Sequence, residues 1–228
     1  MMTTNKLTKT FASVSLAIGV LAGAVLTATS ASAAVLTWGE WTNPDPTLRK
    51  DLIEGDKKVT FKLNSITGSF AAEAADKVAL LKMGDEYDFV YDAMDGATSY
   101  NSTSGSFAYT IEILPTYPGW YINGVDLDSN VTATYNSVTE TFAQIPGLEL
   151  VSTNGLPVPA SGFIGIAPND LLTVTNTLNN TGGPTEGLID FQNSFRQAYI
   201  PNVPEPGTIL GLLAVGGLGL VSRFKKQK

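Results

Sequence analysis

Apolar and polar residues alternate along much of the chain between residues 34 and 200. In the stretch KKVTFKLNSI, Val59, Phe61 and Leu63 would share one face of a strand, with the lysines between them on the other. A period of two is typical of β-strands that are buried on one face. The same period recurs in further segments, at residues 86–94, 106–114, 131–142, 171–178 and 188–200.

Turn residues separate these segments. Asn123-Gly124 lies between WYI and VDL and predicts a two-residue hairpin turn, and Pro118-Gly119 predicts another turn. About nine short strands joined in this way predict a single all-β domain at residues 34–200. We expect a two-sheet antiparallel sandwich of the Ig-like or jelly-roll type.

One stretch has the spacing of a helix instead. In SFAAEAADKVALLKMGD the small and apolar residues recur every three or four positions, and Glu73 and Lys77 form an i,i+4 pair. Gly84 stands where such a helix would end. The pattern predicts one short helix near residues 70–83, with a strand at 77–83 as the alternative.

The first 33 residues have the three parts of a secretory signal peptide. They carry a short basic start at Lys6 and Lys9, continue with an apolar run and end in Ala31-Ser32-Ala33, an A-x-A cleavage pattern. We expect signal peptidase to cut after Ala33, so that the exported chain begins at Ala34. An uncleaved N-terminal anchor is the alternative.

The last segment, residues 207–228, resembles a short membrane span. Its first sixteen residues, 207–222, carry no charge. The basic residues that follow are Arg223, Lys225, Lys226 and Lys228. A sixteen-residue helix would be about 24 Å long, which is shorter than the ~30 Å hydrocarbon core of a bilayer. The positive-inside rule places its basic end in the cytoplasm and the preceding domain outside, and we expect a C-terminal hydrophobic helix here.

A proline-rich linker, residues 201–206, precedes this segment and ends in Val203, Pro204, Glu205 and Pro206. Proline fixes φ and disfavours helix in the residue before it, so VPEP should form an extended strip just outside the membrane. The combination of VPEP, an apolar segment and a basic end resembles the PEP-CTERM sorting signal of exported bacterial proteins, including those of cyanobacteria.

This resemblance implies a sorting route. An exosortase, a membrane-embedded processing enzyme, would cut the chain near Pro-Glu-Pro. The protein would pass through an inner-membrane intermediate and reach the cell surface or the outside. Proteins with this signal occur in bacteria that make exopolysaccharide, so a surface or biofilm-matrix role is implied. A permanently anchored single-pass surface protein is the alternative.

Composition and charge exclude several functions. The chain has no cysteine and no histidine, so it lacks a thiol nucleophile, a disulfide framework and the commonest general base. Residues 34–203 contain eight basic and twenty acidic residues, a net charge of −12, which would repel nucleic acid. No catalytic motif stands out. We expect a protein that is not an enzyme and has no cofactor and no metal; an extracellular hydrolase is a distant third function.

Two acidic groups are candidate calcium ligands. Asp126, Asp128 and Asn130 have a D-x-D-x-N spacing, but Val131 and Ser137 occupy the positions where an EF-hand needs glycine and glutamate. The second group is Asp85, Glu86, Asp88, Asp92 and Asp95. A solvated acidic surface is the interpretation we favour for both groups.

Two aromatic groups are candidate sugar-binding surfaces. They are Trp38 with Trp41, and Tyr117 with Trp120 and Tyr121, and both lie beside proline or glycine turns. Partly exposed aromatic rings offer an apolar surface with a polar edge. We expect both groups to fill the ends of the core, with a secreted carbohydrate-binding module as the second candidate function.

Overall fold

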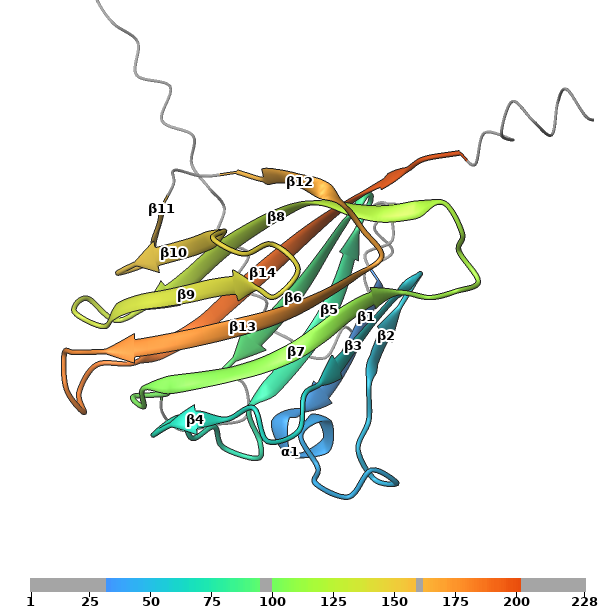
Figure 1. The fold of residues 1–228 in the computed structure, drawn as a ribbon. Helices are drawn as coiled ribbons and strands as arrows, with labels where there is room; N and C mark the ends of the chain where they lie inside the picture. Colours follow the sequence, from blue (N-terminus) through green and yellow to red (C-terminus); the bar gives the residue numbers. More distant parts are fainter. Residues whose placement is uncertain (1–31, 95–99, 159–161, 202–228) are drawn as a thin grey trace, which may run out of the picture.

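The protein is a sandwich of two antiparallel β-sheets (Figure 1). This computed structural model describes residues 32–94, 100–158 and 162–201. The six-stranded sheet has the order β1 (Ser32–Thr37), β5 (Lys77–Met83), β6 (Glu86–Asp92), β14 (Leu188–Tyr199), β8 (Trp120–Val131) and β12 (Ile164–Asn169). The eight-stranded sheet has the order β11 (Leu156–Val158), β10 (Glu149–Thr153), β9 (Asn136–Phe142), β13 (Leu171–Asn180), β7 (Gly105–Ile113), β3 (Lys57–Phe61) and β2 (Leu52–Glu54), and β4 (Thr67–Gly68) pairs with β7. The predicted all-β sandwich is confirmed.

The core lies between the sheets and is rich in aromatic rings. Phe89 on β6 and Tyr109 on β7 are fully buried, and their ring centroids are 4.3 Å apart across the two sheets. The alternation in the sequence is the cause: Tyr87, Phe89 and Tyr91 recur every second residue, so all three point inward. Large aromatic side chains contribute most of the area that such a core removes from water.

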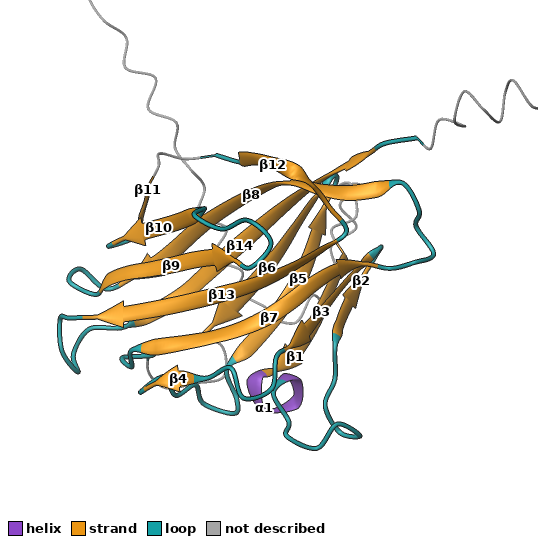
Figure 2. Ribbon diagram, in the orientation of Figure 1, coloured by secondary structure: helices purple, strands orange, loops and turns teal. Residues whose placement is uncertain are grey.

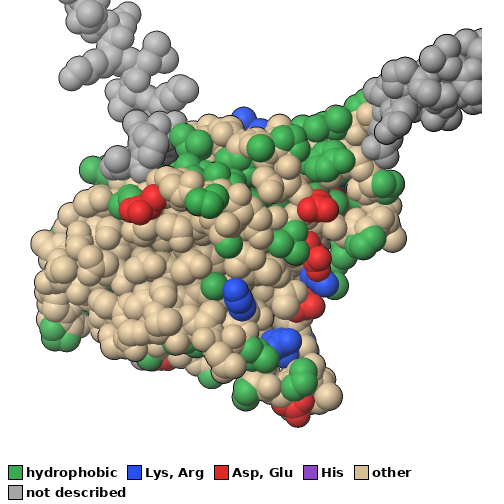
Figure 3. All heavy atoms as spheres, viewed as in Figure 1, with side chains coloured by type: hydrophobic (Ala, Val, Ile, Leu, Met, Phe, Trp, Pro, Cys, Tyr) green, Lys and Arg blue, Asp and Glu red, His purple; other side chains and the backbone are tan. Residues whose placement is uncertain are grey.

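The outer faces of the two sheets differ in chemistry. On the eight-stranded sheet, threonines are direct cross-strand partners: Thr175 faces Thr141, and Thr177 faces Thr139. In the space-filling view, the side formed by β9, β13 and β7 is neither hydrophobic nor charged over most of its area (Figure 3). The outer face of the six-stranded sheet carries carboxylates instead, as described below.

The helix predicted near residues 70–83 is wrong. Lys77–Met83 is strand β5, paired with both β1 and β6, so the alternative strand at 77–83 is confirmed. Val78 and Leu80 point into the core with period two, and burial between two neighbouring strands outweighs the helical propensity of the alanines. The helix of the described residues is the single turn α1 (Trp38–Trp41), capped by Thr37 and coloured purple in Figure 2.

The Asn123-Gly124 turn is also wrong. Both residues lie inside β8, where Gly124 pairs with Arg196 and Ile122 pairs with Gln197. The register shifts between these two pairs, so the ladder absorbs Asn123 as a bulge and not as a reversal. As a result β8 runs on to Trp120 and reaches the end of the sandwich.

The chain leaves the sandwich at one defined place. β14 ends at Tyr199, and the Ile200 amide donates a hydrogen bond of 2.7 Å to the Gly119 carbonyl. We call this the tail-proximal end (Figure 1). In the described ranges, no helix has the length and apolarity to cross a membrane. The C-terminal hydrophobic helix predicted at 207–228 lies outside the described residues.

Candidate functional site

A hollow opens between the sheets at the tail-proximal end. The β2–β3 and β5–β6 turns border it on one side, and the β7–β8 loop and the end of β14 close the other. The lining residues are Gly55, Asp56, Lys82, Gly84, Asp85, Tyr117, Trp120 and Gln197. Segments distant in sequence therefore meet beside the point where the chain leaves the domain.

A buried ion pair forms the floor of the hollow. Lys57 is fully buried, and its Nζ donates a 2.6 Å hydrogen bond to Asp56 and a second bond to the Gln197 side chain. Tyr87 donates its hydroxyl to the other Asp56 oxygen, and its ring centroid lies 4.5 Å from the Lys57 ammonium. These bonds offset the high cost of burying a charge.

Burial shifts the pKa values of the Lys57 ammonium and the Tyr87 hydroxyl in this floor. It lowers the pKa of Lys57, and the hydrogen bond and charge of Asp56 oppose that shift without reversing it. Burial and then the hydrogen bond to Asp56 raise the pKa of Tyr87. The side chains of Tyr87 and Gln197 thus bind the Lys57–Asp56 ion pair and stabilise it in the floor of the hollow.

The rim of the hollow is aromatic. Trp120 packs on Tyr199 with ring centroids 5.4 Å apart, and Tyr117 stands beside them on the β7–β8 loop. Gly119 makes this packing possible: it has φ +87°, and a Cβ there would lie 2.8 Å from the Tyr199 ring. Only glycine meets both conditions without strain.

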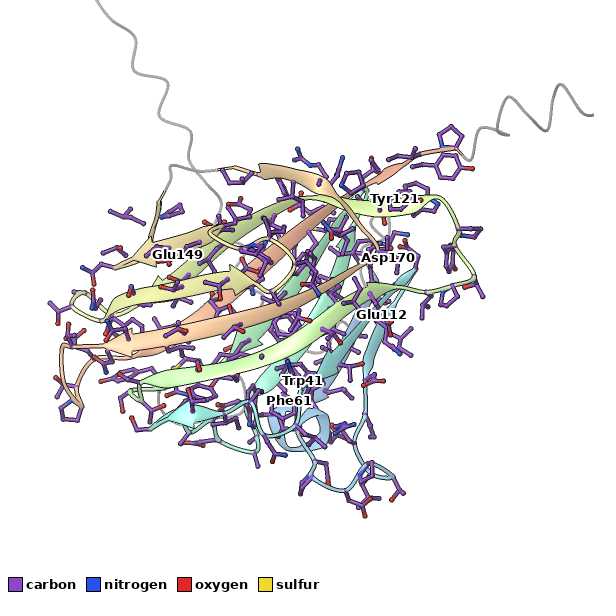
Figure 4. The ribbon with its side chains drawn as sticks, in the orientation of Figure 1. Trp41, Phe61, Glu112, Tyr121, Glu149 and Asp170 are labelled. Atoms are coloured by element: carbon purple, nitrogen blue, oxygen red, sulfur yellow. The ribbon has the colours of Figure 1, made fainter. Side chains whose placement is uncertain are left out.

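The two candidate aromatic groups have different positions in the fold. Trp38 and Trp41 are 5% and 0% exposed and pack against each other and against Phe61 in the core, so the core interpretation is confirmed for this pair (Figure 4). Trp120 is partly buried and Tyr117 is 43% exposed. Only this second group reaches the surface at a candidate site.

The structure brings the two acidic groups together on one face. β14 lies between β6 and β8, and its Ser194 is the cross-strand partner of both Asp88 and Asp126. Asp190 likewise pairs with Asp92 and with Asn130, and Asn130 Nδ2 donates a 3.1 Å hydrogen bond to it. Because the alternate residues of these strands fill the core, the carboxylates project from the outer face of the sheet. Asp128 is exposed there, but Asp88 is 0% exposed and its burial raises its pKa to about 7, so the expected solvated acidic surface is wrong for Asp88.

This acidic face does not assemble a metal site in the part of the chain that the structure describes, where no group of three or more carboxylates is placed to hold an ion. Burial and then the neighbouring Asp128 raise the pKa of Asp126, as expected for like charges held on adjacent outward positions. Asp85 lies apart, in the β5–β6 turn at the hollow. Asp95 lies outside the described residues.

Sequence reasoning did not select Lys57 or Tyr199, although a signal for each was present. Lys57 precedes Val59 and Phe61 by two and four residues, so the alternation already placed it on the inner face of its strand. Tyr199 stands in the same phase as the inward aromatics of its segment. Which strand ends meet at the hollow depends on strand order, and no local pattern encodes that.

The predicted processing sites border the described domain. Ala33 and Ala34 lie in β1, paired with Leu81 and Leu80, whereas Ala31 lies outside the described residues. The sorting motif Val203–Pro206 and the basic end that begins at Arg223 lie outside them as well. The folded domain therefore ends within two residues of the motif.

Taken together, these features define a β-sandwich domain with a small aromatic-rimmed hollow, joined to a short apolar tail. A family model for the PEP-CTERM protein-sorting motif matches residues 202–226. No curated protein matches the chain. The chain therefore carries a PEP-CTERM motif, as its VPEP signature predicted, and such a motif marks an exported protein that an exosortase sorts to the cell envelope or surface.

Proposed function

We propose that this protein is a non-enzymatic component of the cell surface or extracellular matrix, associated with exopolysaccharide. The observation that supports it most is the PEP-CTERM match at residues 202–226, which begins one residue after the end of the described domain. In this proposal the β-sandwich domain is the exported part of the protein, and the tail is its sorting signal.

In this proposal the route has two cuts. Signal peptidase removes residues 1–33 after Ala33, and the tail then holds the exported domain at the inner membrane. An exosortase cuts near Pro204-Glu205-Pro206 and releases the domain or passes it to the surface. The short apolar run, about 24 Å as a helix, suits a temporary hold better than a permanent anchor.

The state of the polar groups in the hollow supports a role without catalysis. The Lys57 ammonium and both Asp56 oxygens are engaged with each other, with Tyr87 and with Gln197. A catalytic acid or base needs a free position toward its substrate. These polar groups instead suit a structural role, in which they stabilise the floor beneath a binding surface.

A carbohydrate-binding module is the second candidate, and the hollow favours it. Trp120 and Tyr117 offer ring surfaces, and Lys82 and Gln197 offer polar groups beside them. Small-ligand sites combine apolar walls with a few placed polar groups in this way.

The sorting part of the proposal is tested by replacing Pro204, Glu205 and Pro206 together with alanine. We expect the wild-type protein to be released from the inner membrane and the triple variant to accumulate there, as read by fractionation. Lys62→Ala, at an exposed position of the domain, is the control and should leave release unchanged. Equal release of wild type and triple variant would contradict the exosortase route.

The matrix part is tested by mixing the released protein with exopolysaccharide from the same cells and with a glycan array. Retention of the protein by the exopolysaccharide supports the proposal. A lack of retention, together with an unchanged biofilm when the gene is deleted, contradicts it.

The glycan array tests the carbohydrate-binding module. Loss of array binding in Trp120→Ala but not in Tyr121→Ala would favour this module, because alternation places Tyr121 on the opposite face of β8.

A further inference from the structure

Exposed apolar side chains gather where the chain leaves the domain. Tyr199 is 55% exposed, Ile200 45% and Tyr117 43%, and the partly buried Trp120 lies between them. We call these four residues the aromatic cap. Figure 3 shows hydrophobic side chains gathered at this end of the domain. The cap lies at the point where the described chain ends.

The linker keeps the cap close to whatever holds the tail. Seven Cα-to-Cα steps join Ile200 to Gly207, where the uncharged segment begins, and they span at most about 25 Å. With the apolar segment in a bilayer, part of that reach is used to cross the headgroup layer, which is roughly 5–8 Å deep on each side. Ile200 itself is fixed to the domain by its hydrogen bond to Gly119.

Only one end of the domain can come this close. β14 runs twelve residues from Leu188 to Tyr199, a length of about 40 Å. The β13–β14 turn, which contains the exposed Thr181, therefore lies a full strand length from the cap. The short linker cannot bring that distal turn to the same membrane surface while the cap is beside it.

The chemistry of the cap suits a lipid headgroup layer. Tyrosine and tryptophan are enriched at membrane–water interfaces, where the ring enters the apolar boundary and the hydroxyl or indole N–H stays hydrated. Two acidic residues, Asp85 and Asp170, are exposed on turns at the same end. They favour a zwitterionic surface over an anionic one, because like charges repel.

We propose that the aromatic cap lies in the headgroup region of the membrane while the tail is inserted. The domain then stands on the bilayer with its distal turn outward, and Pro-Glu-Pro is held at the surface beneath it. Release by cleavage frees the cap together with the adjoining hollow. This inference rests on the proposed sorting route, since it requires an inserted tail.

The test uses the chain that begins at Ala34 and keeps its tail, reconstituted in zwitterionic vesicles with lipids brominated near the top of the acyl chain. The protein has three tryptophans; Trp38 and Trp41 are buried in the core, so Trp120 is the one within reach of the quencher. We expect a loss of tryptophan emission that is absent in Trp120→Phe. Equal quenching in both proteins, or none, would overturn the proposal.

A second readout uses the absence of native cysteine. Single-cysteine variants Tyr117→Cys and Thr181→Cys carry the same environment-sensitive dye, at the cap and at the distal turn. We expect a blue shift and lipid quenching only at position 117, reduced when anionic lipid is added. Equal signals at both positions would overturn the proposal.

Vesicle flotation separates two kinds of failure. Protein that does not float with the vesicles has not inserted its tail, and this outcome contradicts the sorting route itself. Protein that floats but shows unquenched Trp120 contradicts only the placement of the cap. A cap that binds a glycan array but stays away from lipid in the floated protein would assign it to sugar instead.

Discussion

Two lysines adjacent in the sequence experience opposite environments. Lys57 points into the sandwich and pairs with Asp56, and neither is more than 5% exposed. Lys58 points outward and pairs with Glu112, and both side chains are 30% exposed. The alternation of a β-strand thus makes one ion pair a buried element of the hollow and the other an ordinary surface pair.

This contrast predicts unequal costs of removing each acid. Asp56→Ala leaves the Lys57 charge buried without its counter-ion and should lower the free energy of unfolding by about 3–5 kcal/mol. Glu112→Ala, the matched control, should lower it by about 1 kcal/mol or less. Urea unfolding followed by tryptophan fluorescence measures both. Similar values for the two variants would contradict the buried network.

A second buried acid predicts a dependence of stability on pH. Glu140 is fully buried on β9, and neither of its carboxylate oxygens has a hydrogen-bond partner among the described residues. Burial raises its pKa well above the ordinary value. The folded state therefore keeps a proton that the unfolded chain loses near pH 4.3, so the free energy of unfolding should fall as pH rises above that value.

The slope of this fall is at most about 1.4 kcal/mol per pH unit from one group. Glu140→Gln, which carries no titrating proton, should flatten the dependence between pH 5 and 8 and be the more stable protein at pH 8. Glu149→Gln, an exposed position on β10, is the control. The explanation fails if wild type and Glu140→Gln keep parallel pH profiles.

At the scale of elements, the packing of the aromatic rim depends on one glycine in the β7–β8 loop. Gly119 and Gly147 share φ +87°, but a Cβ at Gly119 would meet the Tyr199 ring whereas one at Gly147 meets nothing within 4 Å. Both alanine variants incur the left-handed backbone cost of about 1 kcal/mol. Gly119→Ala should cost more and should also displace Trp120, seen as a shift of its emission; equal costs and spectra would contradict this packing.

Strands were predictable from the sequence where one face of the strand is buried and the other is exposed. The period-two segments at 106–114 and 188–200 became β7 and β14 because their apolar residues share an inner face. The segment 70–83 misled because the alanines at 71–75 suit a helix, and only the pairing with β1 and β6 decides that residues 77–83 form a strand. Asn123-Gly124 misled because a bulge uses the same residues as a turn.

The candidate site was predictable only in part. Tyr117 and Trp120 could be selected as aromatics beside a turn. That they meet Asp56, Lys82 and Gln197 follows from the strand order of two sheets, which joins positions far apart in the chain. The same reasoning explains why Asp88 and Asp126 share a face: β14 lies between their strands, although it is the last strand in sequence.

At the scale of the whole molecule, the described sandwich and the matched sorting motif occupy separate stretches of the sequence. Residues 32–201 hold the sandwich and its hollow, and residues 202–226 match the PEP-CTERM motif. The sequence of the tail was sufficient to predict its class, because motif, apolar run and basic end stand in a fixed order. The partner of the domain depends on surface chemistry that only the fold assembles.

The central claim is that the chain is exported and cut at both ends, and intact-mass spectrometry of the protein recovered from cells tests it most directly. We predict a mature chain that begins at Ala34 and ends near Pro-Glu-Pro, at residues 201–207, without the basic end. A recovered protein that still ends at Lys228 would contradict exosortase sorting, and it would establish the permanent single-pass anchor in its place.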